Sequence, residues 1–100
     1  MLYAIIGEDV PDSQAKRAAA RAAHLVRASE LAEAGRLILA GPFPAIDSPD
    51  PGPAGMAGSL IVAEFESIEA ARGWIEADPY VTHGVFASVS VKPFKQVFPA

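Results

Sequence analysis

The feature that most constrains the fold is an alanine-rich segment of helical pattern, SQAKRAAARAAHLVRASELAEAG, which runs from Ser13 to Gly35. Ser13 suits the N-cap position, the preceding Asp12 favours a helix N-terminus, and Gly35 is typical of a helix stop. These signals predict a helix of about six turns. The spacing of its apolar residues predicts one core-facing stripe, formed by Ala18, Ala22, Leu25, Ser29 and Ala32.

The whole sequence alternates between strand-like and helix-like patterns in the order β-α-β-β-α-β. We predict strands at residues 2–7, 36–40, 59–66 and 85–91, a second helix at 67–77, and a short edge segment at 95–98. This order predicts an α+β, ferredoxin-like fold, a four-stranded antiparallel sheet with two helices on one face. The opposite face would expose apolar residues such as Tyr3, Ile5 or Phe86, which is typical of an interface. We therefore expect an isologous homodimer with sheet against sheet.

A stretch rich in proline and glycine, PFPAIDSPDPGPAGMAG, covers residues 42–58. Its five prolines and three glycines argue against a helix or a central strand. Loops of this length inside a compact domain are usually functional or disordered. Because proline restricts the backbone, we expect an ordered flap that is stiff through residues 42–53 and more mobile around 55–58.

Composition narrows the functional classes. One hundred residues suit one domain over 1–100, and 8 basic against 12 acidic residues give a net charge of −4, which argues against electrostatic binding of nucleic acid or anionic lipid. The absence of cysteine excludes disulfides, thiolate metal sites and a cysteine nucleophile. The N-terminus lacks the basic region of a signal peptide, and no segment approaches the roughly 20 apolar residues of a membrane span. We therefore expect a cytoplasmic protein.

His24 is the main candidate for acid–base chemistry. It lies about 100° around the helix from Leu25, so it borders the predicted apolar stripe, where an imidazole can be partly desolvated and still reach a cleft. A side chain that titrates near neutral pH is useful in such a place. The alternative is a boundary histidine with a satisfied hydrogen bond and no chemical role.

Asp78, in the segment ADPY after the second helix, is the candidate partner of His24. A carboxylate that accepts a hydrogen bond from one imidazole nitrogen fixes the tautomer and makes the other nitrogen a better base. The alternative is a turn-forming Asp-Pro whose side chain bonds to nearby backbone. The spacing of the two residues along the sequence does not show whether they meet.

Other known site signatures are missing from the sequence. His83, in the turn THG, does not combine with His24 and Asp78 in any zinc-ligand spacing, and no HExxH occurs, so we expect no metal and interpret His83 as a solvated turn residue or the rim of a cleft. No GxSxG, GxGxxG or phosphate-binding loop is found either. We therefore expect no cofactor.

Several residues are candidates for the walls of a pocket between the helices and the 42–58 flap. Arg17 and Ser59 would be polar contacts, and Phe43 and Tyr80 would be apolar walls. Arg17 and Arg21 could together meet an anionic substrate, with a solvated helix face as the alternative. These assignments make a small-molecule ligand the expected partner.

The sequence also resembles the YCII-related family along nearly its whole length. The segments that carry the resemblance are MLYAII, AAHL, GRLILAGPFPAIDSPDPGPAGMAGS, IVAEFESIEAA, ADPYV and VSVKPFK. The resemblance implies a ferredoxin-like dimer related to the dimeric α/β barrels that include muconolactone isomerase. The family's proposed site is a His and Asp pair, which matches His24 of AAHL and Asp78 of ADPY. One branch of the family resembles a dehydrochlorinase of chlorinated hydroxyquinol-type compounds, although a shared scaffold does not carry the substrate with it.

Together, the residues and the resemblance favour a small cofactor-independent enzyme. In it, His24 oriented by Asp78 would move a proton on a cyclic or carbonyl-bearing molecule, as a lyase, an isomerase or a dehydrochlorinase-like enzyme. One alternative is a non-catalytic module that binds a metabolite or a protein through the same cleft. Another is a structural dimer, or a higher oligomer, in which the pair contributes only packing.

Overall fold

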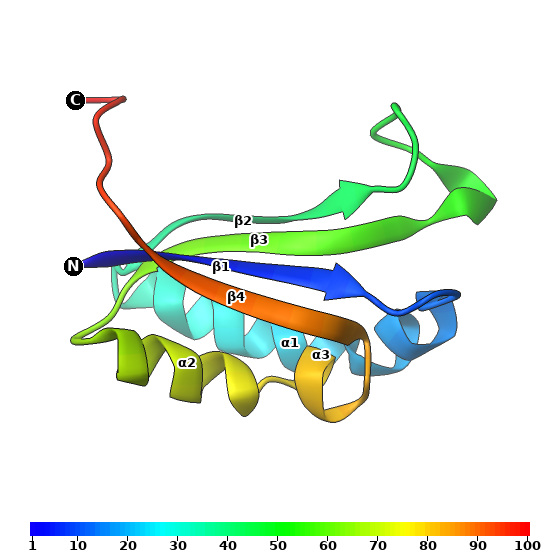
Figure 1. Cartoon of the computed structure of the whole chain (residues 1–100), viewed down its shortest axis with the longest axis horizontal. Helices are drawn as coiled ribbons and strands as arrows, with labels where there is room; N and C mark the ends of the chain where they lie inside the picture. The colour runs from blue at the N-terminus through cyan, green and yellow to red at the C-terminus, as the bar shows by residue number, and fades with distance from the viewer.

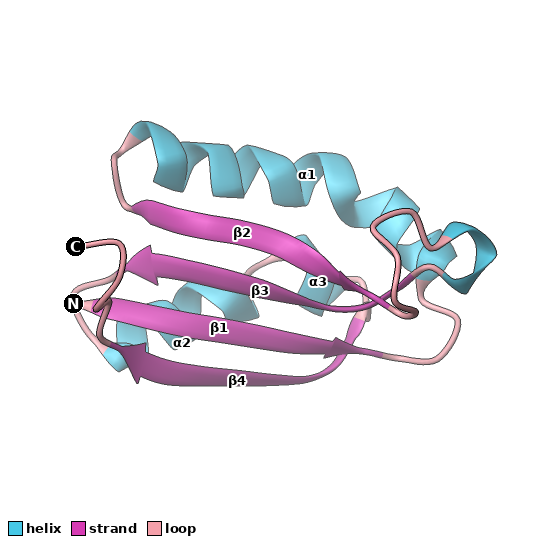
Figure 2. Cartoon of the chain, turned by 90° about the horizontal axis from the view of Figure 1, so that it is seen from above, coloured by secondary structure: helices cyan, strands magenta, loops and turns pink.

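The computed structural model describes all residues from 1 to 100 and has four strands and three α-helices (Figure 1). In chain order the elements are β1 (Leu2–Asp9), α1 (Gln14–Glu33), β2 (Leu37–Pro44), a 3-10 turn (Gly52–Ala54), β3 (Met56–Glu64), α2 (Ile68–Glu76), α3 (Pro79–Thr82) and β4 (Phe86–Phe94). The strands form one antiparallel sheet in the order β2-β3-β1-β4 (Figure 2). The helices all lie on one face of this sheet, which confirms the ferredoxin-like α+β prediction.

The two faces of the sheet differ from the sequence prediction. Tyr3 and Ile5 point toward the helices and are buried in the core, together with Ile61, Ala63, Phe65, Leu31, Ala71 and Ile75. Phe86 also packs against this core, so the expectation that Tyr3, Ile5 and Phe86 lie on the open face was wrong. Because side chains alternate along a strand, Ala4 and Ile6 of β1 take the open face instead.

Helix α1 is turned relative to the predicted stripe. Its buried residues are Arg17, Ala20, His24, Ala28 and Leu31, whereas Ala18, Ala22, Leu25, Ser29 and Ala32 of the predicted stripe are not buried. His24 therefore lies in the middle of the packed face and not at its border. Ser13 does occupy the N-cap position, but its hydroxyl donates to Asp9 Oδ2 at 2.5 Å and makes no cap hydrogen bond.

The proline-rich segment is shorter as a loop than predicted. Strand β2 continues through Pro42 to Pro44, and β3 begins at Met56, which leaves residues 45–55 as the connection. Prolines are tolerated in β2 because it is an edge strand and one side of its backbone has no partner strand. Strand β4 likewise extends to Phe94, and the predicted edge segment at 95–98 is not a strand.

The second helical region is divided in two. Helix α2 ends at Glu76, and Asp78 then serves as N-cap of the short helix α3, with Pro79 at its first position. The Asp78 carboxylate accepts a hydrogen bond from the Tyr80 N–H at 3.0 Å. Tyr80 and Val85 pack with Ala20 of α1, so this capped turn is held directly against the long helix. None of the helices is both long and apolar enough to span a membrane.

Candidate active site

His24 and Asp78 meet where α3 packs against α1. The distance from His24 Nδ1 to Asp78 Oδ2 is 2.7 Å, although the two residues are 54 positions apart in the sequence. Asp78 is fully buried and His24 is 7% exposed. A carboxylate can only accept, so Nδ1 carries the hydrogen and, in the neutral imidazole, Nε2 carries the lone pair.

Asp78 accepts two further hydrogen bonds, one from the Tyr80 N–H to Oδ2 and one from Arg27 Nη1 to Oδ1 at 3.0 Å. Burial by itself raises the pKa of Asp78, but the hydrogen bonds from His24, Tyr80 and Arg27 outweigh it and hold that pKa below its ordinary value. Asp78 is therefore a carboxylate at neutral pH. Arg27 supplies a positive charge beside it, so the buried carboxylate is compensated without a charge on the imidazole.

The His24 ring is held from one side by Tyr80. The two rings are stacked, with centroids 3.9 Å apart and planes at 9°. The Phe86 ring packs edge-on against the Tyr80 ring, with centroids 5.6 Å apart. Phe86 in turn lies against Gly7, where an added Cβ would come within 2.6 Å of the Phe86 ring. The contacts from Gly7 of β1 through Phe86 of β4 to Tyr80 therefore hold the imidazole ring in one plane.

Arg17 is buried and strongly held by residues of the sheet. Its Nε and Nη2 bind the two Asp9 carboxylate oxygens at 2.6 and 2.8 Å, and Nη2 also donates to the Gly58 carbonyl at 2.8 Å and to Ser59 Oγ at 3.1 Å. This bidentate pair fixes the orientation of the guanidinium. The guanidinium also lies beside Tyr80, with Cζ 5.1 Å from the ring centroid.

A cavity of about 480 Å³ opens beside these groups, between α1 and the β2–β3 hairpin. It is lined by Gln14, Arg17, Ala18, Arg21, His24, Leu25 and Ala28 of α1, by Ala40, Gly41 and Pro42 of β2, by Met56, Ser59, Leu60 and Ile61 of β3, and by Tyr80. The predicted site residues Arg17, His24, Ser59 and Tyr80 therefore share one cavity. Asp78 lies behind His24 and does not line it.

Two details of the predicted pocket were wrong. Pro42 and Met56 of the predicted 42–58 flap do line the cavity, but they belong to the paired strands β2 and β3, and no residue of the 45–55 connection lines it. Phe43 pairs with Gly58 and takes the opposite face of the sheet from Ser59, so it lies outside the cavity and is 41% exposed. His83 is an exposed residue at the end of α3, and its Nδ1 lies 3.1 Å from the Pro79 carbonyl oxygen.

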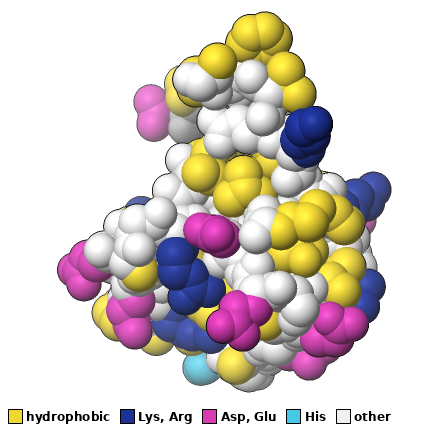
Figure 3. Space-filling view, turned by 90° about the vertical axis from the view of Figure 1, so that its left-hand side faces the viewer, with side chains coloured by type: hydrophobic (Ala, Val, Ile, Leu, Met, Phe, Trp, Pro, Cys, Tyr) yellow, Lys and Arg dark blue, Asp and Glu magenta, His cyan; other side chains and the backbone are white.

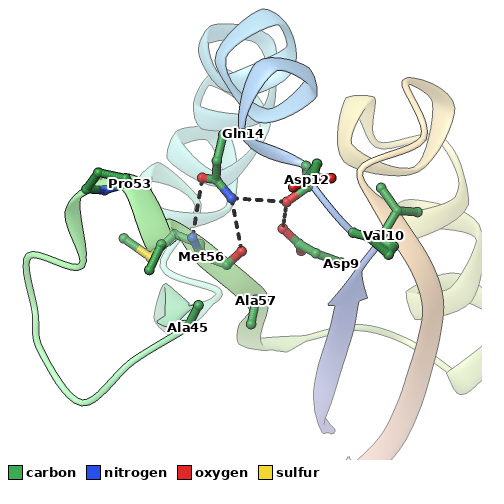
Figure 4. A pocket seen from close by; sticks show the side chains of 11 residues that line it. Asp9, Val10, Asp12, Gln14, Ala45, Pro53, Met56 and Ala57 are labelled. Carbon is green, nitrogen blue, oxygen red and sulfur yellow. Dashed lines mark hydrogen bonds between the residues drawn. The ribbon is translucent and has the colours of Figure 1, made fainter.

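A second cavity of about 320 Å³ lies between the β1–α1 turn and the 45–55 connection (Figure 4). Gln14 and Met56 line both cavities. The Gln14 side-chain amide donates to the Met56 carbonyl at 3.2 Å and accepts from the Met56 N–H at 3.3 Å, as Figure 4 shows. The side chain thus fastens the start of β3 to the first turn of α1. No group of three or more His, Asp or Glu side chains suited to a metal ion occurs in the structure.

Two residues that hold the central side chains of the site, Arg27 and Asp9, were not predicted from the sequence. Arg27 also donates to the Trp74 carbonyl at 2.8 Å and stacks on the Trp74 ring at 4.5 Å. Arg27 lies three residues after His24, so the two side chains share one face of α1, and this spacing could have identified Arg27 as a neighbour of the site. The local sequence does not mark Asp9 in this way, because its partner Arg17 lies beyond the turn that joins β1 to α1.

Comparisons with known proteins show which sequences this chain resembles. The sequence matches the YCII-related domain over residues 1–95. It is 58% identical over 98 residues to Protein YciI of Escherichia coli, covering 98% of this chain and 100% of that protein. A Haemophilus influenzae protein is 49% identical over 98 residues, with the same coverage.

A solved structure supports the fold independently. The 5-chloro-2-hydroxyhydroquinone dehydrochlorinase of Burkholderia phenoliruptrix, in complex with 2,5-dihydroxybenzoquinone, superimposes with a TM-score of 0.82 at 29% identity. The match covers 95% of this chain and 94% of the dehydrochlorinase. The likeness therefore extends over nearly the whole of both proteins.

Proposed function

Because the chain belongs to the YCII-related family, we propose that it is a small enzyme in which His24, oriented by Asp78, transfers a proton to or from a small cyclic or carbonyl-bearing substrate. The observation that carries the proposal is the 2.7 Å contact from His24 Nδ1 to Asp78 Oδ2, with His24 in the wall of an open cavity. Lyase, isomerase or dehydrochlorinase-like chemistry fits such a pair.

The division of labour follows from the hydrogen bonds. Asp78 fixes the imidazole with its lone pair on Nε2, which makes that nitrogen the base that accepts a proton from the substrate. The resulting imidazolium is stabilised by the carboxylate that holds it. Arg17, the Ser59 hydroxyl and the Tyr80 side chain are the groups that position the substrate in the cavity.

The structural neighbour supports the class of substrate. Its name describes loss of hydrogen chloride from a hydroxylated ring, and its ligand is a hydroxylated quinone. At 29% identity over 95% of this chain, the likeness favours a small ring with hydroxyl or carbonyl groups as substrate here. A cavity of about 480 Å³ is large enough for one such ring.

We test the proposal by replacing the pair. A panel of hydroxylated and halogenated quinols would be assayed for chloride release or change in ring absorbance with wild type, His24→Gln and Asp78→Asn. We expect each change to lower kcat/KM by about 10² to 10⁴-fold, the usual contribution of a general acid–base group. His83→Gln is the matched control, because His83 is the other histidine and lies outside the cavity.

Two outcomes would contradict the enzymatic proposal. Turnover that His24→Gln leaves unchanged would remove the base from the mechanism. Ligand binding that survives His24→Ala, with no turnover of any compound by the wild type, would favour a non-catalytic binding module on the same cavity.

We also propose that the protein is a homodimer formed through the open face of the sheet. Leu39 and Phe43 of β2 lie on this face and are 48% and 41% exposed, and the half-buried Ile6 and Leu60 continue the apolar surface across β1 and β3. After β4, the chain rises above the same face (Figure 1), and hydrophobic side chains lie at the top of the projection seen in Figure 3. A second copy of the sheet is the occupant whose apolar surface matches this one.

A further inference from the structure

The charge of the cavity differs from the charge of the whole protein. The chain carries a net charge of −4, yet the residues that line the cavity include Arg17, Arg21 and His24 and no aspartate or glutamate. A concave surface lined by one sign of charge attracts ligands of the other sign. The cavity is therefore built for a ligand with a negative charge.

Of the two arginines, Arg21 carries the uncompensated charge. Arg17 is paired with Asp9 at 2.6 Å, so its charge is largely cancelled inside the protein. Arg21, one turn further along α1, makes no ion pair and no side-chain hydrogen bond within the chain, and it is exposed at the cavity. A guanidinium presents paired donors that match a carboxylate or an ionised enol.

Tyr80 adds a neutral donor next to this charge. Burial raises the pKa of Tyr80, against the opposing effect of Arg17 and Arg21, so its hydroxyl keeps its proton at neutral pH. Tyr80 also lies against His24, with ring centroids 3.9 Å apart. An anionic oxygen near Arg21 and Tyr80 would therefore sit close to the proposed base.

We infer that the cavity selects small cyclic substrates that carry an anionic oxygen, a ring carboxylate or an ionised enol, and that Arg21 is the residue that recognises it. The inference rests on the proposed function, because it specifies the substrate class of the same site. The apolar side of the cavity, with Leu25, Pro42 and Ile61, accommodates the ring, and Arg21 binds its charged edge.

The test compares two quinones that share one ring. The probe 2,5-dihydroxybenzoquinone is a vinylogous carboxylic acid and is ionised at neutral pH, whereas 2,5-dimethoxybenzoquinone is neutral. Calorimetric titration would give the Kd of each with wild type, Arg21→Gln, Arg21→Lys and Arg72→Gln. Arg72 is the matched control, because it is an exposed arginine on α2 outside the cavity.

We expect the wild type to bind the ionised quinone about tenfold more tightly than the neutral one, since a charge-assisted pair adds roughly this much affinity. Arg21→Gln should remove that preference by weakening only the ionised ligand, Arg21→Lys should keep part of it, and Arg72→Gln should change neither Kd. Raising the salt concentration should weaken binding of the ionised quinone alone.

Equal effects of Arg21→Gln on both quinones, no effect on either, or no saturable binding of either would overturn the inference. Its failure is separable from failure of the proposed function. His24→Gln should lower turnover by about 10² to 10⁴-fold and keep the preference for the ionised quinone, so an anion preference in a wild type without turnover counts against the catalytic role alone. Turnover that needs His24 but shows no dependence on Arg21 counts against the anion site alone.

Discussion

At the scale of single residues, Asp78 combines two local roles that the sequence offered as alternatives. It is the N-cap of α3, bonded to the Tyr80 N–H, and it also binds His24 from α1. The cap fixes the position of the carboxylate along the chain, and Arg27 provides the compensating charge. A turn-forming aspartate can therefore orient a histidine without any further element.

The first prediction concerns the charge of Asp78. Asp78→Asn should lower the free energy of unfolding by about 2 kcal/mol at pH 7, because a buried carboxylate that accepts charge-assisted hydrogen bonds is lost and Arg27 loses its ion pair. Since folding lowers the pKa of Asp78, this stabilisation is complete above the ordinary carboxyl pKa of about 4 and is lost as the pH falls through the lower pKa of the folded state.

Urea unfolding of wild type and Asp78→Asn between pH 7 and pH 2 would measure this difference. The two curves should converge as the pH falls. Asp47→Asn, a change at an exposed aspartate with no ion pair, should track the wild type throughout. A gap between wild type and Asp78→Asn that stays constant over the range would show that ionisation of Asp78 does not stabilise the fold.

Contacts between residues far apart in the sequence could not be predicted from local sequence patterns. The chemical type and local context of His24 and Asp78 identified them as candidates, but only the family resemblance linked them, since 54 residues separate the two. The role of Arg27 was not predicted, because an arginine on a helix usually faces solvent. Its role depends on Asp78 and Trp74, whose positions local patterns do not fix.

At the scale of elements, the contacts from Gly7 to Phe86, Tyr80 and His24 connect the sheet to the site. Gly7 lies on β1 next to the β-bulge at Glu8 and Asp9, and its missing side chain makes room for the Phe86 ring. Phe86 supports Tyr80, and Tyr80 supports the imidazole. A substitution at Gly7 should therefore alter the surroundings of the His24 ring although the two residues are not in contact.

Gly7→Ala should destabilise the protein by about 1–3 kcal/mol, the usual cost of adding a methyl group to a packed region. The displaced Phe86 should also shift the NMR signals of the His24 ring, because Tyr80 stacks on that ring. Gly41→Ala is the matched control, since an added Cβ there meets no atom within 4 Å.

Phe86→Leu combined with Gly7→Ala should recover part of the stability, because the smaller side chain leaves space for the methyl group. Normal His24 signals in Gly7→Ala would rule out this route from the sheet to the site.

Element types were predictable from the sequence, whereas the phase of α1 was not. Alanine fills buried and exposed positions equally well, so the alanine-rich residues 18–22 carry little information on which side of the helix faces the sheet. The true packed face contains Arg17 and His24, two polar residues whose burial depends on Asp9 and Asp78. The prolines of β2 were misread for a similar reason, since their tolerance depends on the edge position that only the strand order reveals.

At the scale of the whole molecule, one sheet face is covered and the other is open, as the order of elements predicted. The sequence did not show which residues take the open face, because both faces of the segment Leu2–Gly7 are apolar and a shift by one residue exchanges them. The register with β3 and β4 resolves this ambiguity and gives the open face to Ala4 and Ile6.

The last prediction follows from that open face. A standard interface covers about 800 Å² per partner, a modest fraction of the 6024 Å² that one chain exposes, so a sheet-to-sheet dimer is within reach of this surface. Sedimentation equilibrium should give twice the mass of the 10.4 kDa chain for the wild type. Leu39→Glu and Leu60→Glu should each shift the protein toward monomer, because two-fold symmetry places each new carboxylate in the contact twice.

Val26→Glu is the matched control for the dimer. Val26 is 59% exposed on α1, away from the open face, so the same charge there should leave the mass unchanged. A monomeric wild type would refute the dimer, and a Leu39→Glu or Leu60→Glu variant that keeps the double mass would move the contact to another surface. If the dimer forms as proposed, the cavity stays accessible in it, because α1 and most of the strand residues that line the cavity, such as Pro42, Ser59 and Ile61, lie on the helix side of the sheet.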